Sequence, residues 1–209
     1  MTETKEKILD TAQRLIGEQG YGATSVRHIT AEAGVNLAAI HYHFGTKEDL
    51  LGSIIQRKVV PVNEERLARL ARVEAEASPG APSVKQILDA WLLPMAEAAD
   101  RDPGFVRLMG RLMAEGMLQA IVEKHFGKIA ERITGALRSA LPHLTDEEFL
   151  WRIHFMFGAM AHTMCGKNEV TGLGGDTRDF GGRIERLVTF LTAGFQAPAT
   201  HAGRSGANQ

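Results

Sequence analysis

Apolar residues recur at every third or fourth position along most of the chain, and this is the spacing of helices that each bury one face. The first such segment covers 6–20, where Gly20 suits the left-handed position that ends a helix. Polar residues that can cap a helix stand in front of the next three segments. These segments are 26–33 after Ser25, 37–43 after Asn36, and a longer helix from Thr46 toward Arg72.

The remainder of the chain predicts five more helices, and one residue predicts a distortion in the fourth. Pro61 lies inside that fourth helix, where a proline removes a hydrogen bond and clashes with the preceding turn. We therefore expect a kink or a break near Val59–Pro61. The five later helices cover about 83–99, 103–117, 119–140, 145–165 and 183–195.

Two segments do not fit the helical spacing. The glycine-rich run 171–182 predicts a mobile loop, and 197–209 predicts a disordered tail. No segment alternates between apolar and polar residues as a strand should. We therefore predict an all-α fold of about nine helices. A three-helix head covers 1–50, and a larger helical body for ligand binding and dimerisation covers 51–196.

The composition is that of an ordinary folded protein, with 209 residues, 44% hydrophobic and 23% charged. Basic and acidic residues nearly balance, at 24 and 25, which excludes a polycation and a globally disordered chain. Cys165 is the single cysteine, so neither an intrachain disulfide nor a four-cysteine zinc site can form. The charged N-terminus has no signal core, and no charge-free stretch makes an apolar span of roughly 20 residues. We expect a cytoplasmic protein.

The first 55 residues carry the most specific pattern. Two short helices joined by the tight turn Gly34-Val35-Asn36, behind a longer first helix, form a helix-turn-helix. Further positions fit the same frame: Ile8-Leu9-Asp10-Thr11-Ala12, Gly20-Tyr21, Thr24-Ser25-Val26, Ile29, Ala33, Tyr42-His43-Phe44, Lys47 and Leu50-Leu51. Over roughly Lys5 to Ile55 the chain thereby resembles the TetR family of transcriptional regulators. The resemblance implies a DNA-binding head on a dimeric body.

The second helix of such a pair enters the major groove and meets base edges with its N-terminal residues. Leu37 and Ala38 allow close approach and can touch a thymine methyl, while Arg27 can pair with guanine and Asn36 with adenine. His41 stands where the family commonly has Tyr, which leaves its contact, base or phosphate, open. The predicted DNA-binding residues are Ser25, Arg27, His28, Asn36, Leu37, Ala38 and His41, and the resemblance adds phosphate contacts by Tyr42, His43 and Lys47.

The head is slightly acidic, which sets a condition on this interpretation. Residues 1–50 hold five Lys or Arg and seven acids, whereas a DNA-binding head usually shows a basic footprint. The charges must therefore be sorted by face, and we expect a modest non-specific affinity that relies on a dimer. The acids expected to lie away from DNA are Glu3, Glu6, Asp10 and Glu18.

The helix predicted over 145–165 is apolar nearly all round beyond Arg152. Such a helix must be covered on more than one side, and the simplest second cover is the same helix of another copy. Together with the last helix, this predicts a two-fold homodimer with a four-helix interface. The predicted interface residues are Trp151, Phe157, Met160, Met164, Leu187, Phe190 and Leu191.

Methionine and aromatic side chains of the body form either an ordinary core or an adaptable apolar pocket. For the pocket we predict Phe105, Leu108, Met109, Leu112, Met113, Met117, His154 and Phe155. Two segments, 148–161 and 33–45, are similar to the fatty-acid-responsive PsrA subgroup of the family, which implies a fatty acid or acyl-CoA effector. Its carboxylate could meet His154, His162 or Arg111.

The resulting prediction is a repressor that binds a partly palindromic operator in double-stranded DNA and is released by a small apolar effector. The alternative within the class is a regulator of efflux or catabolism that answers a drug-like or aromatic compound. A helical module without DNA binding is a further alternative, with the acidic head as its argument. An enzyme using His154, His162 and Cys165 lacks a nucleophile–base motif, and the histidine spacings give no third metal ligand, so we expect neither a cofactor nor a metal.

Overall fold

The computed structural model describes residues 2–117, 126–165 and 179–199, and the regular secondary structure in these residues is entirely α-helical. The all-α prediction is confirmed, with nine helices in this part of the chain. They are α1 (Thr2–Gln19), α2 (Val26–Ala33), α3 (Leu37–His43), α4 (Lys47–Ala77), α5 (Val84–Arg101), α6 (Pro103–Ala114), α8 (Gly127–Ala140), α9 (Asp146–Cys165) and α10 (Phe180–Gln196). Among the described helices we find none with the length and apolar content needed to cross a membrane.

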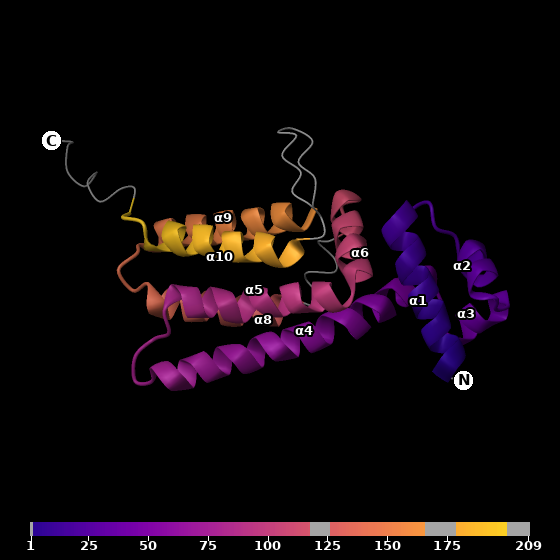
Figure 1. Ribbon diagram of the computed structural model, residues 1–209, viewed down its shortest axis with the longest axis horizontal. Helices are drawn as coiled ribbons and strands as arrows, with labels where there is room; N and C mark the ends of the chain where they lie inside the picture. Colours follow the sequence, from indigo (N-terminus) through magenta and orange to yellow (C-terminus); the bar gives the residue numbers. More distant parts are fainter. Residues whose placement is uncertain (1, 118–125, 166–178, 200–209) are drawn as a thin grey trace.

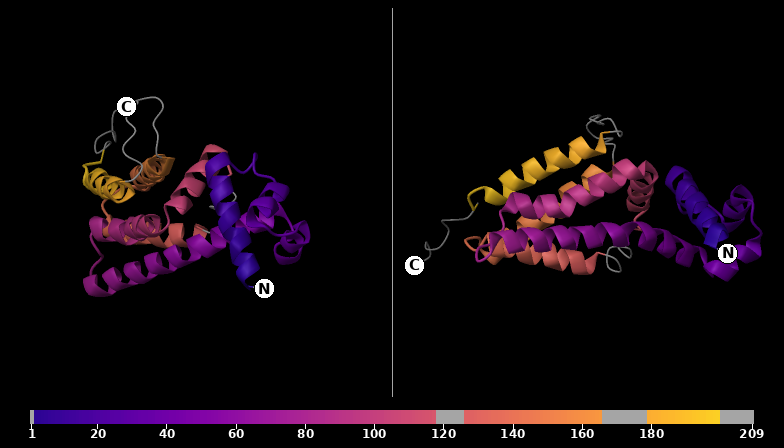
Figure 2. Two further views of the ribbon diagram at one scale, coloured as in Figure 1. Left: turned by 45° about the vertical axis from the view of Figure 1, so that its right-hand side comes forward. Right: turned by 60° about the horizontal axis from the view of Figure 1, so that its bottom comes forward.

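The helices form an elongated molecule with a small head at one end and a body at the other (Figure 1). The head consists of α1, α2 and α3. From the head, α4 runs along the body beside α5 and α8, while α9 and α10 lie together on the other side of α5 (Figures 1 and 2). Helix α6 stands across the end of the body that faces the head, and it packs against α1.

Local capping explains where the short head helices begin. The Ser25 side chain accepts a hydrogen bond from the His28 N–H at 3.1 Å, and Asn36 Oδ1 accepts one from the Ala39 N–H at 2.9 Å. Gly34 closes α2 with a φ of 61°, a left-handed conformation that glycine adopts without strain. The predicted bounds of α2 and α3 are therefore confirmed to the residue.

Helix α4 has 31 residues and continues through Pro61. Of the predicted kink or break near Val59–Pro61, the break is therefore excluded. The helix does bend along its length in the right-hand view of Figure 2, and proline is a common cause of such a bend because its ring cannot donate the intrahelical hydrogen bond. The predicted capping box between Thr46 and Asp49 is present, with N–O distances of 3.0 and 3.3 Å.

Several predicted bounds shift in the structure. Helix α1 starts at Thr2 rather than at residue 6, and α4 ends at Ala77 rather than near Arg72. Helix α10 starts at Phe180, so the end of the predicted glycine-rich loop is helical. The predictions of a helix start near 119, of a loop over 171–178 and of a disordered tail over 200–209 lie outside the described residues.

Two clusters of buried apolar side chains stabilise the fold. One fills the body, where α5 packs against both α4 and α10, and it includes Leu88 and Leu191. The other joins the head helices to the start of α4 and to α6, and it includes Ile16 and Leu108. We call the second cluster the head core. Helix α6 thus contacts both the head and the body.

Candidate functional site

Helix α3 presents one face to solvent and buries the other in the head core. Leu37 (40% exposed) and Tyr42 (72% exposed) lie on the outer face together with the exposed Ala38 and His41, whereas Ile40 is fully buried. These four outer residues share one side because a helix turns once in 3.6 residues. None of them is acidic, so this outer face can approach a polyanion.

The other residues assigned to DNA contacts from the sequence are placed around this face. Arg27 is exposed on α2, and His28 is half-buried. The half-buried His43 ring lies edge-on to Tyr42, with ring centroids 5.0 Å apart, and thereby braces the tyrosine. Because Asn36 Oδ1 accepts the capping hydrogen bond, the Asn36 amide NH₂ group is the part that can donate to a base.

Ser25 and Lys47 are committed to the fold of the head. The Ser25 oxygen caps α2, as described above. Lys47 Nζ donates to the Tyr21 carbonyl oxygen at 2.6 Å and lies 3.9 Å from the Tyr21 ring centroid. Burial lowers the pKa of Lys47, against the opposing effect of the Glu48 charge. Lys47 therefore stabilises the turn before α2, and a phosphate contact would compete with that interaction.

Several acidic residues of the head lie on α1 and are paired with basic residues. Arg57 of α4 binds Glu6 at 2.6 Å and Asp10 at 2.8 Å, and Arg14 binds Glu18 at 3.3 Å. Arg14 also binds Glu32 of α2 at 2.8 Å. These acids are thus paired with basic residues, and their orientation away from bound DNA stays a prediction.

An apolar cavity of about 350 Å³ lies in the body. Its volume and its mostly apolar wall are those of a site for a small molecule. The wall includes Val59, Val62 and Arg66 of α4, Trp91 and Met95 of α5, Phe105 and Met109 of α6, Phe126, Ile129 and Ala130 near the start of α8, and Phe157 and Met160 of α9.

The apolar stripe of α6 borders both the cavity and the head core, and only part of it lines the cavity. Phe105 and Met109 lie on the cavity wall. Leu108 and Leu112 are fully buried in the head core, and Met117 packs against that core, but none of the three is part of the cavity wall. For these three residues the pocket assignment is wrong, because the wide apolar stripe of α6 serves two neighbours.

The pocket assignment is also wrong for His154 and Phe155, which are exposed on the outer side of α9. The proposed carboxylate partners His162 and Arg111 are likewise exposed. Arg111 binds Glu115 at 3.2 Å, at the junction of head and body. None of these four side chains is part of the described cavity wall.

Exposed apolar side chains gather on the outer side of α9 and α10. Leu150, Trp151 and Phe155 of α9 are 64%, 51% and 62% exposed, and Phe190 of α10 is 68% exposed. The Trp151 and Phe155 rings stack with centroids 5.8 Å apart. We call these four residues the α9–α10 patch. Such a group on two adjacent helices is typical of a protein–protein contact rather than of scattered surface residues.

Only part of the predicted dimer interface lies on the α9–α10 patch, namely Trp151 and Phe190. Phe157 and Met160 are half-buried and line the cavity, and their place in an interface stays a prediction. The assignment is wrong for Leu187 and Leu191, which are buried in the body core. A side chain buried within its own protomer cannot contact a partner. The side chains of Met113 and Met164 lie outside the described residues.

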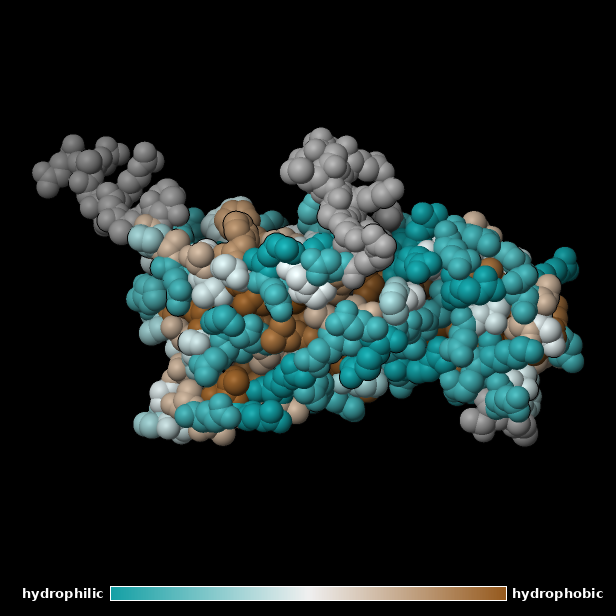
Figure 3. Space-filling view, viewed as in Figure 1, coloured by the Kyte–Doolittle hydropathy of each residue, from teal (hydrophilic) through white to brown (hydrophobic). Residues whose placement is uncertain are grey.

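Polarity also divides the surface of the molecule between head and body. On the face shown in Figure 3, apolar surface gathers over the body between α10 and α4, whereas the head is mostly hydrophilic. The surface of the head therefore suits a polar binding partner, and the surface of the body suits apolar ones.

Comparison with known proteins agrees with this layout. Residues 8–54 match the family model described as bacterial regulatory proteins, tetR family, and residues 89–194 match the model described as tetracyclin repressor-like, C-terminal domain. The second match covers half of the chain. The chain belongs to the TetR family.

Individual TetR-family proteins resemble the chain over most of its length. The dual regulator CecR of Shigella flexneri is 32% identical over 184 residues, which cover 80% of this chain and 78% of that protein. The repressor Rv3405c of Mycobacterium tuberculosis is 28% identical over 81% of each chain. The solved structure of the fatty acid degradation regulator FadR from Bacillus halodurans has the same fold, with 17% identity, a TM-score of 0.62 and coverage of 93% and 97%. The chain is thus a DNA-binding transcriptional regulator, and its family is not a class of enzymes.

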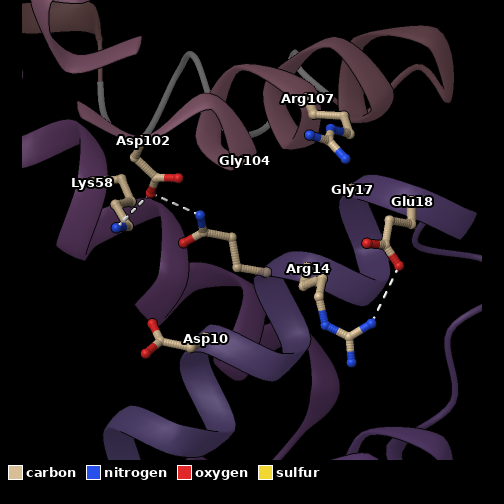
Figure 4. Close-up of a pocket in the computed structure, with 9 residues that line it drawn as sticks. Asp10, Arg14, Gly17, Glu18, Lys58, Asp102, Gly104 and Arg107 are labelled. Atoms are coloured by element: carbon tan, nitrogen blue, oxygen red, sulfur yellow. Dashed lines mark hydrogen bonds and ion pairs between the residues drawn. The ribbon is translucent and has the colours of Figure 1, made fainter. Parts of the chain in front are cut away.

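In this TetR-family chain, the head meets the body at a charged cleft of about 410 Å³ between α1, α4 and α6 (Figure 4). One carboxylate, that of Asp102, joins all three helices. It pairs with Lys58 Nζ at 2.7 Å, accepts a hydrogen bond from Gln13 Nε2 at 2.9 Å, and accepts another from the Phe105 N–H at 3.2 Å. Burial raises the pKa of Asp102, but the contacts with Lys58 and Gln13 outweigh it and hold the pKa below its usual value.

Replacing Asp102 with alanine should lower the free energy of unfolding by about 1–3 kcal/mol, because the Lys58 and Gln13 contacts and the cap of α6 are all lost. Since the folded-state pKa lies below the unfolded one, the contribution of the charge is present above about pH 4 and is lost as the pH falls through the folded value. Urea unfolding from pH 7 to pH 3 measures it. Asp102→Asn, which can keep the cap, is the matched control, and a difference from wild type that does not shrink toward pH 3 would contradict the role of the charge.

The sequence analysis did not assign Arg66 and Trp91 to the pocket or Leu150 to the exposed patch on α9, where the structure places them. A signal for Arg66 was present, because it continues the apolar stripe of α4 that runs through Val59, Val62 and Leu70 at spacings of three and four. A charged residue on an apolar stripe is a candidate for burial. Leu150 next to Trp151 carries no such signal, since α9 is apolar on both sides.

Proposed function

We propose that the chain is a homodimeric repressor that binds a partly palindromic operator through α3 and releases it when a small apolar effector occupies the body cavity. The observation that carries this proposal is the double role of α6. Phe105 and Met109 of α6 line the cavity and also belong to the head core, and the neighbouring side of α6, around Leu108, packs on α1. Operator binding would place the protein in the cytoplasm.

Repression as the mode of action is supported by the relative Rv3405c, which is described as a repressor, while CecR is described as a dual regulator. The dimer is supported by the α9–α10 patch, because two copies related by a two-fold axis would cover it mutually. A dimer also sets the spacing of the two α3 helices, which must match successive major grooves about 34–36 Å apart.

For the effector, the apolar cavity supports a fatty acid or acyl-CoA, and the fold shared with a fatty acid degradation regulator supports the same class. An aromatic or drug-like effector is the second candidate. It is favoured by the edge-to-face pair of Trp91 and Phe157 on the wall, with ring centroids 5.6 Å apart, since a flat ligand can join such a pair.

The contact between α6 and α1 is close enough to transmit a movement. A Cβ atom on Gly17 of α1 would lie 3.4 Å from the Leu108 backbone nitrogen, so the two helices touch along their backbones. An effector that displaces Phe105 or Met109 would thus shift α1 and change the distance between the two heads. Such a ligand lowers operator affinity only if it binds the shifted arrangement better.

The proposed function is tested by footprinting purified protein on fragments of the source genome, followed by gel shifts on each protected site. The expected result is protection of a partly palindromic sequence and its release by a fatty acid or an aromatic compound. A fluorescent fatty-acid displacement assay separates the two effector classes. Absence of any protected site would contradict the DNA-binding role of α3.

Replacing Pro61 with alanine should change effector-induced release more than it changes the folding of the free protein. Alanine restores the missing N–H within α4 and removes the cause of the bend, and Pro61 is exposed, so no packing is lost. Thermal melts report the folding, and effector titrations of the operator complex report the response. Unaltered induction would argue against α4 as a hinge.

A further inference from the structure

Arg66 is the most deeply buried charged residue of the described chain. It lies on α4, its relative exposure is 2%, and it forms part of the cavity wall. Arg66 Nε donates to the Trp91 carbonyl oxygen at 2.7 Å, and Nη1 donates to Asn63 Oδ1 at 2.9 Å. An arginine has five N–H donors, so most of its donor capacity is not used by the described residues.

The two acceptors of Arg66 are neutral, and no carboxylate pairs with it within the residues that the structure describes. The other buried arginine, Arg152, shows what a neutralised site looks like, since it binds Glu148 at 2.8 Å and also the Phe195 carbonyl oxygen. Burial lowers the pKa of Arg66 only to about 10, so its guanidinium remains charged at pH 7. Among the described residues this buried cation has the Phe126 ring at 6.0 Å but no counter-charge, and an anion in the cavity would stabilise it.

We propose that Arg66 anchors the carboxylate of the effector, and that the effector is therefore a monocarboxylate with an apolar body. This inference rests on the proposed function, in which the cavity is the effector site. The planar guanidinium can hold a carboxylate through two parallel hydrogen bonds. The apolar body would lie against Phe105 and Met109 of α6, so that the bound acid contacts both α4 and α6.

The size of the cavity restricts the acid further. Its volume of about 350 Å³ is that of roughly a dozen water-sized groups. A medium-chain acid of roughly eight to ten carbons has about this number of heavy atoms and suits the space. A free acid places its charge at the acyl end, where Arg66 lies, whereas a CoA thioester is neutral there and carries its charges on a nucleotide too large for the cavity. The structure therefore favours the free acid.

Isothermal titration calorimetry with octanoate and its neutral analogue 1-octanol tests the proposal. Wild-type protein should bind octanoate at least about tenfold more tightly than 1-octanol, because a hydrogen bond to a charged group adds that much. Arg66→Met should remove this preference and leave 1-octanol binding within about threefold. Methionine fills similar volume, and its introduction leaves no described carboxylate without a partner, because the acceptors of Arg66 are neutral. Arg66→Lys should keep part of the preference, which a purely structural role of the arginine does not predict.

Arg69→Met is the matched control, because Arg69 lies one turn further along α4, pairs with Glu65 and Glu97 and is not part of the cavity wall. It should bind octanoate like wild type. Equal binding of octanoate and 1-octanol by wild type, or an unchanged preference in Arg66→Met, overturns the anchoring role while leaving an apolar effector in place. If the ligand-free wild-type protein does not bind any operator, the proposed function itself is refuted. Parallel titrations with 4-phenylbutyrate and 4-phenylbutanol show whether the carboxylate carries an alkyl or an aryl body.

Discussion

Replacing Phe155 with glutamate should convert the dimer into a monomer and weaken operator binding by about 100-fold or more. Phe155 belongs to the α9–α10 patch and stacks on Trp151, and its 62% exposure shows that the fold of the protomer does not depend on it. In a two-fold interface the substitution buries two carboxylates without partners, which costs several kcal/mol. One head alone then loses the gain from binding two half-sites at once.

Light scattering at micromolar concentration and gel shifts on the operator measure the two parts of this prediction. Val60→Glu is the matched control, since Val60 is also an exposed apolar residue but lies on α4, away from the α9–α10 patch. It should remain a dimer. Leu191→Glu provides the contrast, because Leu191 is 4% exposed in the body core, and its replacement should lower thermal stability instead. If the Phe155→Glu protein remains a dimer, the proposed interface is wrong.

The head could be predicted closely from the sequence because its information is local. Ser25, Asn36 and Gly34 act on backbone groups within three residues of themselves, so the bounds of α2 and α3 follow from the residues at their ends. The exposure of Leu37 and Tyr42 also follows from the helical period once Ile40 is placed inside.

The body could not be predicted to the same depth, because its helices are apolar on more than one side. In α9 the sequence does not show which stripe faces the body. Phe155, which was predicted to line the pocket, is exposed, and Phe157, which was predicted for the interface, lines the cavity. The same holds for α6, where Phe105 meets the cavity and Leu108 meets α1. Which side a neighbour occupies is decided by contacts distant in sequence, and no local pattern records them.

Two signals in the sequence conflict at Arg66. It continues the apolar stripe of α4, but it also stands in a segment rich in charges, with Glu64, Glu65 and Arg69 around it, and such a segment usually indicates a solvated face. The structure instead turns Arg66 toward Trp91 of α5, where α4 and α5 pack against each other. The proposed ligand chemistry therefore became visible only when both helices were in place.

Replacing Leu37 with glutamate should lower operator affinity by about 100-fold or more while leaving the fold intact. Leu37 is 40% exposed on the outer face of α3, beside Tyr42, so its replacement disturbs no core contact. In a complex the new carboxylate would face the DNA. It would repel the phosphates, and it could not form hydrogen bonds with the many acceptor groups of the major groove. Fluorescence anisotropy on the operator at fixed salt measures the loss, and circular dichroism confirms the helices. Ala71→Glu introduces the same charge at an exposed position of α4 in the body and should bind like wild type. If both variants bind the operator within about threefold of wild type, α3 does not read DNA and the helical interaction module becomes the better interpretation of the head.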